Sequence, residues 1–292
     1  MQGKVVVITG ATSGIGQVTA ETLAAMGARI VQVARDRARG ALAMQRLGAR
    51  APGVAHRMFY ADLSRLSEMV RVGSEIAQAE ERIDVLINNA GAMFGSRQVT
   101  EDGLERTFAL NHVAYFVLSH QLRARLAASA PSRIVSTASD AHRPVTLAFD
   151  DLQSVKAYAA VVSGWLIYGG PGVRVYARSK LCNILFTREL ARRLAGTGVI
   201  ANCLDPGLVA TRFGDESGGL VSAAYRVIKR FGLSPELGAQ TLVYLASSPH
   251  VATVTGEYFT KCRPVAPSRA AQDDGVAQRL WEVTEELTGL RS

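Results

Sequence analysis

The stretch KVVVITGATSGIG, residues 4–16, decides the fold of this 292-residue chain. Its first half is rich in β-branched residues, which favours a buried strand. Gly10, Gly14 and Gly16 then lead into a helical segment that is predicted to end at about Met26. Such glycines let the backbone approach a pyrophosphate, and the N–H groups at the start of the helix attract its charge. The spacing is GxxxGxG rather than GxGxxG, so this turn alone also fits a simple strand-to-helix turn.

Six further β-rich runs follow at the spacing of repeated strand–helix–strand units. They are ARIVQVA (28–34), AHRMFYA (55–61), IDVLINN (83–89), SRIVST (132–137), VIANCL (199–204) and GEYFT (256–260). Several are apolar at consecutive positions, which is typical of a parallel sheet covered by helices on both faces. No linker, repeat or low-complexity tract divides the sequence. The chain is therefore predicted to be a single α/β domain with a doubly wound, Rossmann-type parallel sheet of about seven strands.

Composition and charge restrict the classes of function. Hydrophobic residues make up 48% of the chain, enough to bury a large core. The net charge is +8, but the arginines are scattered, so nucleic-acid binding is not expected. Cys182, Cys203 and Cys262 have neither CxxC spacing nor histidines at ligand spacing. Neither a metal site nor a disulfide framework is expected, and a reducing compartment fits best.

The N-terminus and the most apolar loop candidate carry no signal for export or membrane insertion. Residues 1–10 lead directly into a strand, without the charged start and cleavage site of a secretory signal. The segment AYAAVVSGWLIYGG, 157–170, contains three glycines and is shorter than the roughly 18 residues that span a bilayer. We therefore expect a cytoplasmic protein without a membrane span.

The end of the second strand, in ARDRARG at 34–40, is where a dinucleotide fold meets the adenosine ribose. An acidic residue there favours NAD, whereas an arginine offers a fork of donors to a 2′-phosphate. Side chains alternate in extended chain, so Arg35 is expected to face the ribose and Asp36 to turn away or cap the next helix. Arg37 and Arg39 would add positive potential. The sequence therefore predicts NADP(H) as the preferred cofactor.

A tyrosine and a lysine stand four apart in VYARSKLCN, residues 175–183. On a helix, Tyr176 and Lys180 would share one face. A nearby ammonium stabilises a phenolate, which would let tyrosine move a proton at an alcohol or carbonyl oxygen. On spacing alone, however, an ordinary surface pair is the better interpretation. Two neighbouring tyrosines, Tyr158 and Tyr168, have no lysine four residues later.

Together with five other segments, these features make the chain resemble the short-chain dehydrogenase/reductase family, in its retinol-dehydrogenase-like branch. The main motifs, in the family's order, are TGATSGIG (9–16), ARDRARG (34–40), ADLS (61–64), NNAG (88–91), LNHVAYFVL (110–118), RIVSTASDAH (133–142), YARSK (176–180) and DPGLVATRF (205–213). The resemblance covers nearly the whole length of the chain.

The resemblance implies a catalytic set made of Asn111, Ser139, Tyr176 and Lys180. Ser136 and Thr137 also carry hydroxyls and are alternative candidates for the catalytic hydroxyl. Counting from RIV at 133–135, however, places Ser139 at the family's catalytic position. In the family's scheme this serine bonds the substrate oxygen, and the asparagine holds a water that links the lysine to solvent. From its own sequence context, Asn111 fits a helix-bending or capping role equally well.

The resemblance also implies where NADP(H) would bind. The implied residues are Gly10, Thr12, Ser13, Gly14, Ile15, Gly16, Arg35, Asp62, Leu63, Asn89, Ala90, Gly91, Tyr176, Lys180, Pro206, Gly207, Val209 and Thr211. Asp62 is expected near the adenine, residues 88–91 along the cofactor cleft, and residues 206–211 beside the nicotinamide. The cofactor-binding half would extend over about 1–140, and the catalytic and substrate half over about 141–292.

The stretch before Tyr176 departs from the family by its length. We expect an extended loop over about 157–175, and long loops beside a reaction centre are usually substrate elements or lids. Trp165, Leu166, Ile167 and Tyr168 would cover an apolar substrate or pack at a subunit contact, with Gly169, Gly170 and Gly172 as hinge points.

The sequence therefore predicts an oxidoreductase that interconverts an apolar alcohol with its aldehyde or ketone by direct hydride transfer. Tyr176 would act as the general acid or base. A catalytically silent NADP(H)-binding sensor or scaffold is the alternative. The resemblance leaves a homodimer or a homotetramer open, formed through the helices that carry Asn111 and Tyr176.

Overall fold

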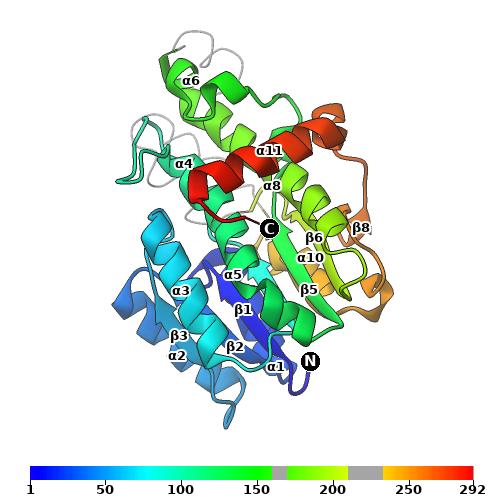
Figure 1. The fold of residues 1–292 in the computed structure, drawn as a ribbon. Coiled ribbons are helices and arrows are strands. Elements are labelled where there is room, and N and C mark those ends of the chain that lie inside the picture. The colour runs from blue at the N-terminus through cyan, green and yellow to red at the C-terminus, as the bar shows by residue number, and fades with distance from the viewer. Residues whose placement is uncertain (160–169, 210–232, 292) are drawn as a thin grey trace.

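The strands of the fold lie side by side in one sheet. The computed structural model describes residues 1–159, 170–209 and 233–291, and these form one eight-stranded sheet in the order β3-β2-β1-β4-β5-β6-β7-β8 (Figure 1). The strands are β1 (Val5–Thr9), β2 (Arg29–Ala34), β3 (Arg57–Tyr60), β4 (Val85–Asn88), β5 (Ser132–Thr137), β6 (Val199–Asp205), β7 (Tyr258–Thr260) and β8 (Arg263–Pro264). All seven predicted strands are present. The prediction missed β8, which pairs antiparallel with β7.

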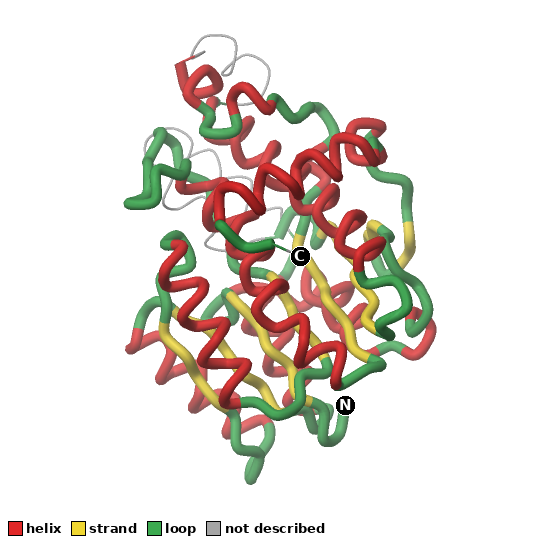
Figure 2. The backbone as a smooth tube through the Cα atoms, viewed as in Figure 1, coloured by secondary structure: helices red, strands yellow, loops and turns green. Residues whose placement is uncertain are grey.

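Helices connect the strands and cover the sheet (Figure 2). In the described parts of the chain the α-helices are α1 (Gly14–Ala25), α2 (Arg37–Arg50), α3 (Leu66–Ala79), α4 (Arg106–Phe108), α5 (Ala114–Ala128), α6 (Val155–Ala159), α8 (Pro171–Arg193), α10 (Pro235–Ser247) and α11 (Asp274–Thr288). A π-helical turn, η1 (Ala109–Val113), joins α4 to α5, and the 3₁₀ turns are η2 (Asp140–His142), η3 (Phe149–Asp151), η5 (Pro249–Val251) and η6 (Arg269–Gln272).

Strand β1 explains why the strand runs are apolar without alternation. Val5 and Val7 pack in the core between the sheet and α3, α5 and α8. Val6 and Ile8 face the other way, into the core under α1 and α10. Both faces of the sheet are thus covered by helices, as expected for a parallel sheet. The chain forms one Rossmann-type α/β domain.

The order of the strands fixes the place where a ligand can bind. On one side of β1 the chain proceeds to β2 and β3, and on the other side to β4, β5 and β6. The connections therefore leave the sheet in opposite directions at the β1–β4 boundary, which opens a crevice at the carboxyl ends of these strands. Gly10 follows β1 at this end, and Asn89 follows β4.

The C-terminal helix α11 lies across α5 and α8 (red in Figure 1). The Trp281 ring centre is 4.8 Å from that of Phe116 on α5 and 5.8 Å from that of Phe186 on α8. This part of the surface of α5 and α8 is covered by the chain itself. A dimer formed through these two helices would have to include α11 or use their uncovered parts.

The segment expected as a loop over 157–175 is partly helical. Helix α6 includes the first residues of this segment, up to Ala159, and helix α8 begins at Pro171. Residues 160–169, including Trp165–Gly169, lie outside the described residues. Gly172 is not placed as a hinge. It lies inside α8, where a Cβ would be 2.3 Å from Phe94 O, so glycine allows a close helix contact. Within the described parts of the chain, no helix combines the length and apolar character needed to cross a membrane.

Candidate active site

The glycine turn after β1 packs directly on the NNAG segment after β4. A Cβ at Gly10 would lie 2.7 Å from the Cα of Ala90, and a Cβ at Gly16 would lie 2.4 Å from both Gly10 O and Asn89 Nδ2. Asn89 Nδ2 donates to Thr9 O and to Gly10 O, both at 3.1 Å. Since any larger residue would separate the two segments, these glycines are required for the crevice at the β1–β4 boundary.

Helix α1 presents its N-terminus to this crevice. Ser13 stands at the N-cap, but its side chain makes no capping bond within the described structure, and the first turn has no acidic residue. The N–H groups of that turn and the positive end of the helix dipole therefore remain available to an anion. Thr12 and Ser13 are half-buried beside them. This arrangement suits a pyrophosphate.

Two of the arginines after β2, Arg37 and Arg39, point to different places. Asp36 caps α2, as one of the two predicted roles had it, by accepting a hydrogen bond from Arg39 N (2.8 Å). Arg39 Nη2 donates to Ser13 Oγ (3.0 Å), so its guanidinium reaches the glycine turn. The Arg37 guanidinium instead lies 4.6 Å from the centre of the Tyr60 ring. Arg39 therefore belongs to the crevice and Arg37 does not.

Asp62 follows β3 at the same end of the sheet. Burial alone would raise the pKa of its carboxyl, but hydrogen bonds from Ser64 and the charges of Arg35 and Arg106 bring the pKa below its ordinary value. Asp62 is therefore an ionised acceptor near Arg35. Leu63 beside it is buried.

Asn111 lies in the π-helical turn and joins two segments of the site. Its Nδ2 donates to Ala92 O (3.0 Å) and to Ser179 Oγ (2.9 Å), while its Oδ1 accepts from Ala92 N (2.9 Å). The side chain thus ties the chain after NNAG to helix α8. The helix-bending role expected from the sequence context has a counterpart here, because Asn111 lies in a π-helical turn, where the helix geometry changes. Its catalytic role stays a prediction.

Tyr176 and Lys180 lie one turn apart on α8, as their spacing predicts. Lys180 is 3% exposed, its Nζ donates to Thr137 O (2.8 Å), and it lies 5.6 Å from the centre of the half-buried Tyr176 ring. Burial lowers the pKa of Lys180 to about 7, while the charge of Asp205 acts in the opposite direction. An ammonium in this position can stabilise a phenolate at Tyr176.

The three competing hydroxyls at the end of β5 differ in their surroundings. Ser136 is fully buried inside the strand, and Thr137 Oγ1 donates to Asn89 Oδ1 (3.3 Å). Ser139 lies beyond the strand end, is half-buried, and caps η2 by accepting from Ala141 N (3.2 Å). Ser139 is therefore the hydroxyl best placed to face a ligand.

Comparisons with known proteins agree with this geometry. The sequence model of the short chain dehydrogenase family matches residues 4–160, and retinol dehydrogenase 14 of Homo sapiens is 40% identical over 306 residues, spanning 99% of this chain and 88% of the relative. The chain belongs to the short-chain dehydrogenase family. It lies in the retinol-dehydrogenase-like branch, as the sequence motifs predict.

Solved structures of this short-chain dehydrogenase family share the fold. An uncharacterised protein of Mycobacterium paratuberculosis matches with a TM-score of 0.75 and 31% identity, covering 99% of this chain and 95% of that one. A short chain dehydrogenase from Burkholderia cenocepacia in complex with NADP matches with a TM-score of 0.68 and 25% identity, covering 93% of this chain and 99% of that one.

The far side of this short-chain dehydrogenase's crevice is built from the segment after β6. Pro206 and Gly207 follow the strand, and Gly207 N donates to Asp205 Oδ2 (3.0 Å). A Cβ placed on Gly238 of α10 would meet both Val209 and Ile15, so these two side chains lie close together beside the glycine turn. Thr211, also predicted for the cofactor, lies outside the described residues.

Helix α11 supports the turn that carries Asn111. The Thr284 hydroxyl donates its proton to Leu280 O (2.7 Å), so it must accept the hydrogen bond from His112 Nε2 (3.0 Å). His112 is next to Asn111 in η1. Burial lowers the pKa of His112 to about 3, which keeps the imidazole neutral. Helix α11 therefore packs against the turn that carries Asn111.

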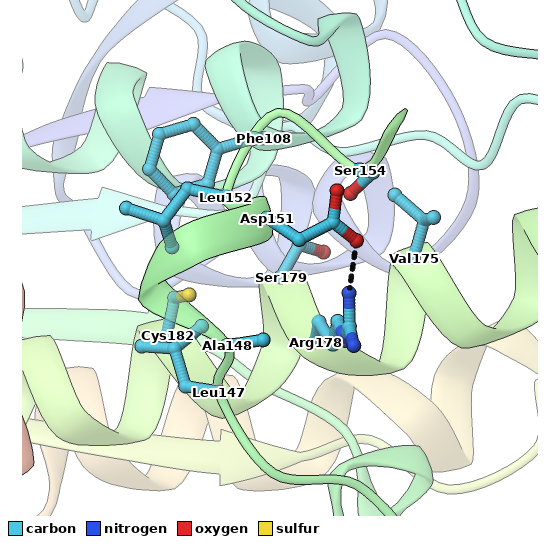
Figure 3. A pocket seen from close by; sticks show the side chains of 10 residues that line it. All are labelled: Phe108, Leu147, Ala148, Asp151, Leu152, Ser154, Val175, Arg178, Ser179 and Cys182. Atoms are coloured by element: carbon cyan, nitrogen blue, oxygen red, sulfur yellow. Dashed lines mark hydrogen bonds and ion pairs between the residues drawn. The ribbon is translucent and has the colours of Figure 1, made fainter. Parts of the chain in front are cut away.

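A small pocket lies between α8 and residues 147–154 (Figure 3). Asp151 faces it and accepts from Arg178 Nη1 (3.1 Å) on α8 and from the backbone N–H groups of Lys156 and Ala157. The pocket has room for only about one water molecule. The contacts of Asp151 therefore anchor α6 to α8, and the pocket is too small to hold a substrate.

Two buried polar residues near Lys180 were not predicted from the sequence. Tyr115 is fully buried on α5, with its ring centre 5.7 Å from Lys180 Nζ. Asn183 on α8 donates from Nδ2 to Thr137 O (3.1 Å), the same carbonyl that Lys180 uses. A signal was present, because Asn111, Tyr115 and Ser119 recur every four residues on a mostly apolar helix and so share one face.

Proposed function

We propose that this protein is an NADP(H)-dependent oxidoreductase that interconverts an apolar alcohol with its aldehyde or ketone. The observation that carries the proposal is a buried Lys180 beside Tyr176 on one helix, next to the crevice at the β1–β4 boundary. A dinucleotide-binding protein without activity does not need a buried ammonium next to a tyrosine, whereas proton transfer at an alcohol oxygen does.

Each member of the catalytic set has a role that follows from its position. The bound cofactor supplies or accepts the hydride at the substrate carbon. Tyr176 gives a proton to the substrate oxygen in reduction and removes it in oxidation, and Lys180 stabilises the phenolate form. Ser139 donates a hydrogen bond to the same oxygen. Asn111 holds the helix that carries Tyr176 against the segment that lines the cofactor crevice.

The crevice fits a nicotinamide dinucleotide, with the half of the chain up to about residue 140 supplying most of its contacts. The tight glycine turn and the open N-terminus of α1 provide a place for the pyrophosphate. The preference for NADP(H) is supported by Arg39, whose guanidinium reaches Ser13, and by Arg35, whose charge acts on Asp62. Two guanidinium groups in this region suit a 2′-phosphate better than a free ribose hydroxyl.

An apolar substrate is supported by the relatives in this branch. Retinol dehydrogenase 14 is named for an apolar alcohol, and the chain aligns with almost all of that protein. The apolar stretch Trp165, Leu166, Ile167 and Tyr168, expected from the sequence as a substrate cover or a subunit contact, lies outside the described residues and carries no part of this proposal. We propose the class of substrate and not retinol itself.

The test is NADPH consumption with aliphatic, aromatic, steroid and retinoid carbonyls, with NADH in parallel. Tyr176→Phe should lower kcat by about 10²- to 10⁴-fold, the usual contribution of a general acid or base, while NADPH binding stays within about twofold. Tyr244→Phe, on α10 at the opposite face of the sheet, is the matched control and should keep full activity.

Two results would overturn the proposal. Retained turnover in Tyr176→Phe would remove the role of that tyrosine. Tight NADPH binding by the wild type without turnover of any carbonyl on the panel would favour the sensor or scaffold instead.

A further inference from the structure

Four fully buried side chains near Lys180 each have a polar atom without a hydrogen-bond partner among the described residues. They are Tyr115 Oη, Asn183 Oδ1, Ser136 Oγ and Asn88 Oδ1. Asn88 and Ser136 are register partners on β4 and β5, so their side chains point to the same face of the sheet. Asn88 Nδ2 donates to Ser119 Oγ on α5, which places this face under α5. Unpaired polar atoms are costly in such a layer, so a cluster of them requires an explanation.

Two of the four lie directly around the Lys180 ammonium. Lys180 Nζ is 5.7 Å from the centre of the Tyr115 ring. Asn183 Nδ2 and Lys180 Nζ donate to the same carbonyl, Thr137 O, at 3.1 and 2.8 Å. This shared acceptor brings the Asn183 amide group close to the ammonium, and the Oδ1 of that amide has no partner among the described residues.

One water molecule could form hydrogen bonds with Lys180 Nζ, Tyr115 Oη and Asn183 Oδ1. An ammonium has three N–H donors, and Thr137 O is the acceptor found for Lys180 among the described residues. A water can accept from Lys180 Nζ and from the Tyr115 hydroxyl, and can donate to Asn183 Oδ1. Buried waters typically make about three such bonds to polar groups that otherwise have no partner.

We propose that Lys180, Tyr115 and Asn183 bind one buried water, and that Tyr115 is thereby a positioning residue for the reaction. The inference rests on the function proposed above for its kinetic effect. The residues proposed here to hold the water, Tyr115 and Asn183, are not those that the family's scheme names, and the side chain of Asn111 contacts Ala92 and Ser179.

The water would favour the charged form of Lys180. Burial lowers the pKa of this lysine, and an extra acceptor opposes that effect by stabilising the ammonium. The titratable groups that face Lys180 are Tyr176 on its own helix, Tyr115 from α5 and Asp205 from β6. Asp205 is buried, and burial raises the pKa of its carboxyl. Removing the Tyr115 hydroxyl leaves Asp205 in place. The effect of that hydroxyl on the pKa of Lys180 can therefore be measured separately from the effect of Asp205.

The kinetic test is Tyr115→Phe, assayed in alcohol oxidation across the pH range. A less readily charged Lys180 stabilises the Tyr176 phenolate less, so the rising limb of kcat/KM should move to higher pH by about 0.5 to 1 unit, the size expected for one lost hydrogen bond. The KM for NADP⁺ should stay within about twofold. Tyr244→Phe should leave the profile unchanged. An unchanged profile in Tyr115→Phe overturns the positioning role.

Two measurements test the water without relying on activity. Removal of a hydroxyl that is truly unpaired should raise Tm, whereas removal of one that holds a water should lower it. A high-resolution crystal structure should show a water within about 3.2 Å of Lys180 Nζ and Tyr115 Oη, lost in Tyr115→Phe. A raised Tm, or wild-type density without that water, overturns the inference. Absence of turnover by the wild type would instead reject the proposed function and leave both of these measurements valid.

Discussion

Lys180 is a buried cation, and replacing it with methionine should stabilise the unliganded protein while abolishing turnover. Burial lowers the pKa of Lys180 from 10.5 to about 7. Each tenfold change in an acid constant is worth about 1.4 kcal/mol, so the charged lysine costs the folded state about 4 to 5 kcal/mol. Methionine is unbranched and adaptable in a core, and Thr137 O keeps the hydrogen bond from Asn183. We expect Lys180→Met to raise the free energy of unfolding by about 2 to 4 kcal/mol at pH 7.

The stabilisation by Lys180→Met should depend on pH in one direction only. Between about pH 7 and 10.5 the unfolded chain binds the Lys180 proton and the folded chain does not, so this group makes wild-type stability rise with pH. Below about pH 7 both states are protonated and the full cost is present. The advantage of Lys180→Met should therefore be largest at and below pH 7 and should narrow as the pH approaches 10.5.

Urea denaturation of both proteins from about pH 6 to 9, without cofactor, measures the difference directly. Lys156→Met is the matched control, because Lys156 is exposed and pairs with Asp150 on the surface. That control should show no advantage that changes with pH in this range. A gain that is absent, or equal at both ends of the range, would show that Lys180 is not held in the folded state at a lowered pKa. The buried water proposed above would reduce the gain, so Tyr115→Phe should enlarge it.

Two further predictions concern the cofactor crevice and the C-terminal helix. Arg35→Ala and Arg39→Ala should each weaken NADPH binding by about tenfold and NADH binding by less than about twofold, while Arg37→Ala, whose side chain stacks on a tyrosine, should change neither. Fluorescence titration with both cofactors checks this, and equal losses for the two cofactors would argue against a phosphate contact. Thr284→Val should lower the free energy of unfolding by about 1 to 3 kcal/mol in urea, because the buried N–H of His112 loses its acceptor. A change below about 0.5 kcal/mol would mean that this hydrogen bond does not support the layer.

The elements that could be predicted are those specified by neighbouring residues. The strand runs and the glycine turn depend on residues within one segment, and all seven predicted strands are present. The cap by Asp36 reaches only three residues along the chain. The shared face of Tyr176 and Lys180 follows from helix spacing alone. Interactions between residues close in sequence were therefore sufficient to predict the strands, the glycine turn and the shared helix face of Tyr176 and Lys180.

The features that were missed depend on contacts between distant segments. Asn111 and Ser179 are 68 residues apart, so no local pattern indicates that one amide joins both sides of the site. Strand β8 follows a turn at Lys261 and Cys262, which adopt φ values of +48° and +60° without the glycine that usually marks such a turn. The spacing of Asn111, Tyr115 and Ser119 indicates a shared helix face, but it does not indicate that Lys180 lies beside Tyr115.

The layer between the sheet and α5 and α8 explains why these distant contacts belong together. It contains Lys180 and Asp205, whose pKa values are shifted by burial, and it also contains Tyr115, a phenol without a partner among the described residues. A core built only for stability would place apolar side chains there. On the function proposed above, the ammonium is buried so that its charge is already in position, away from bulk water, when a phenolate forms at Tyr176. Helix α11 closes this layer from outside, and its contacts with α5 and α8 contribute apolar burial that offsets part of the cost. On this reasoning, the stability of the fold and proton transfer make opposite demands on residue 180. Lys180→Met is therefore expected to raise the free energy of unfolding and to abolish turnover.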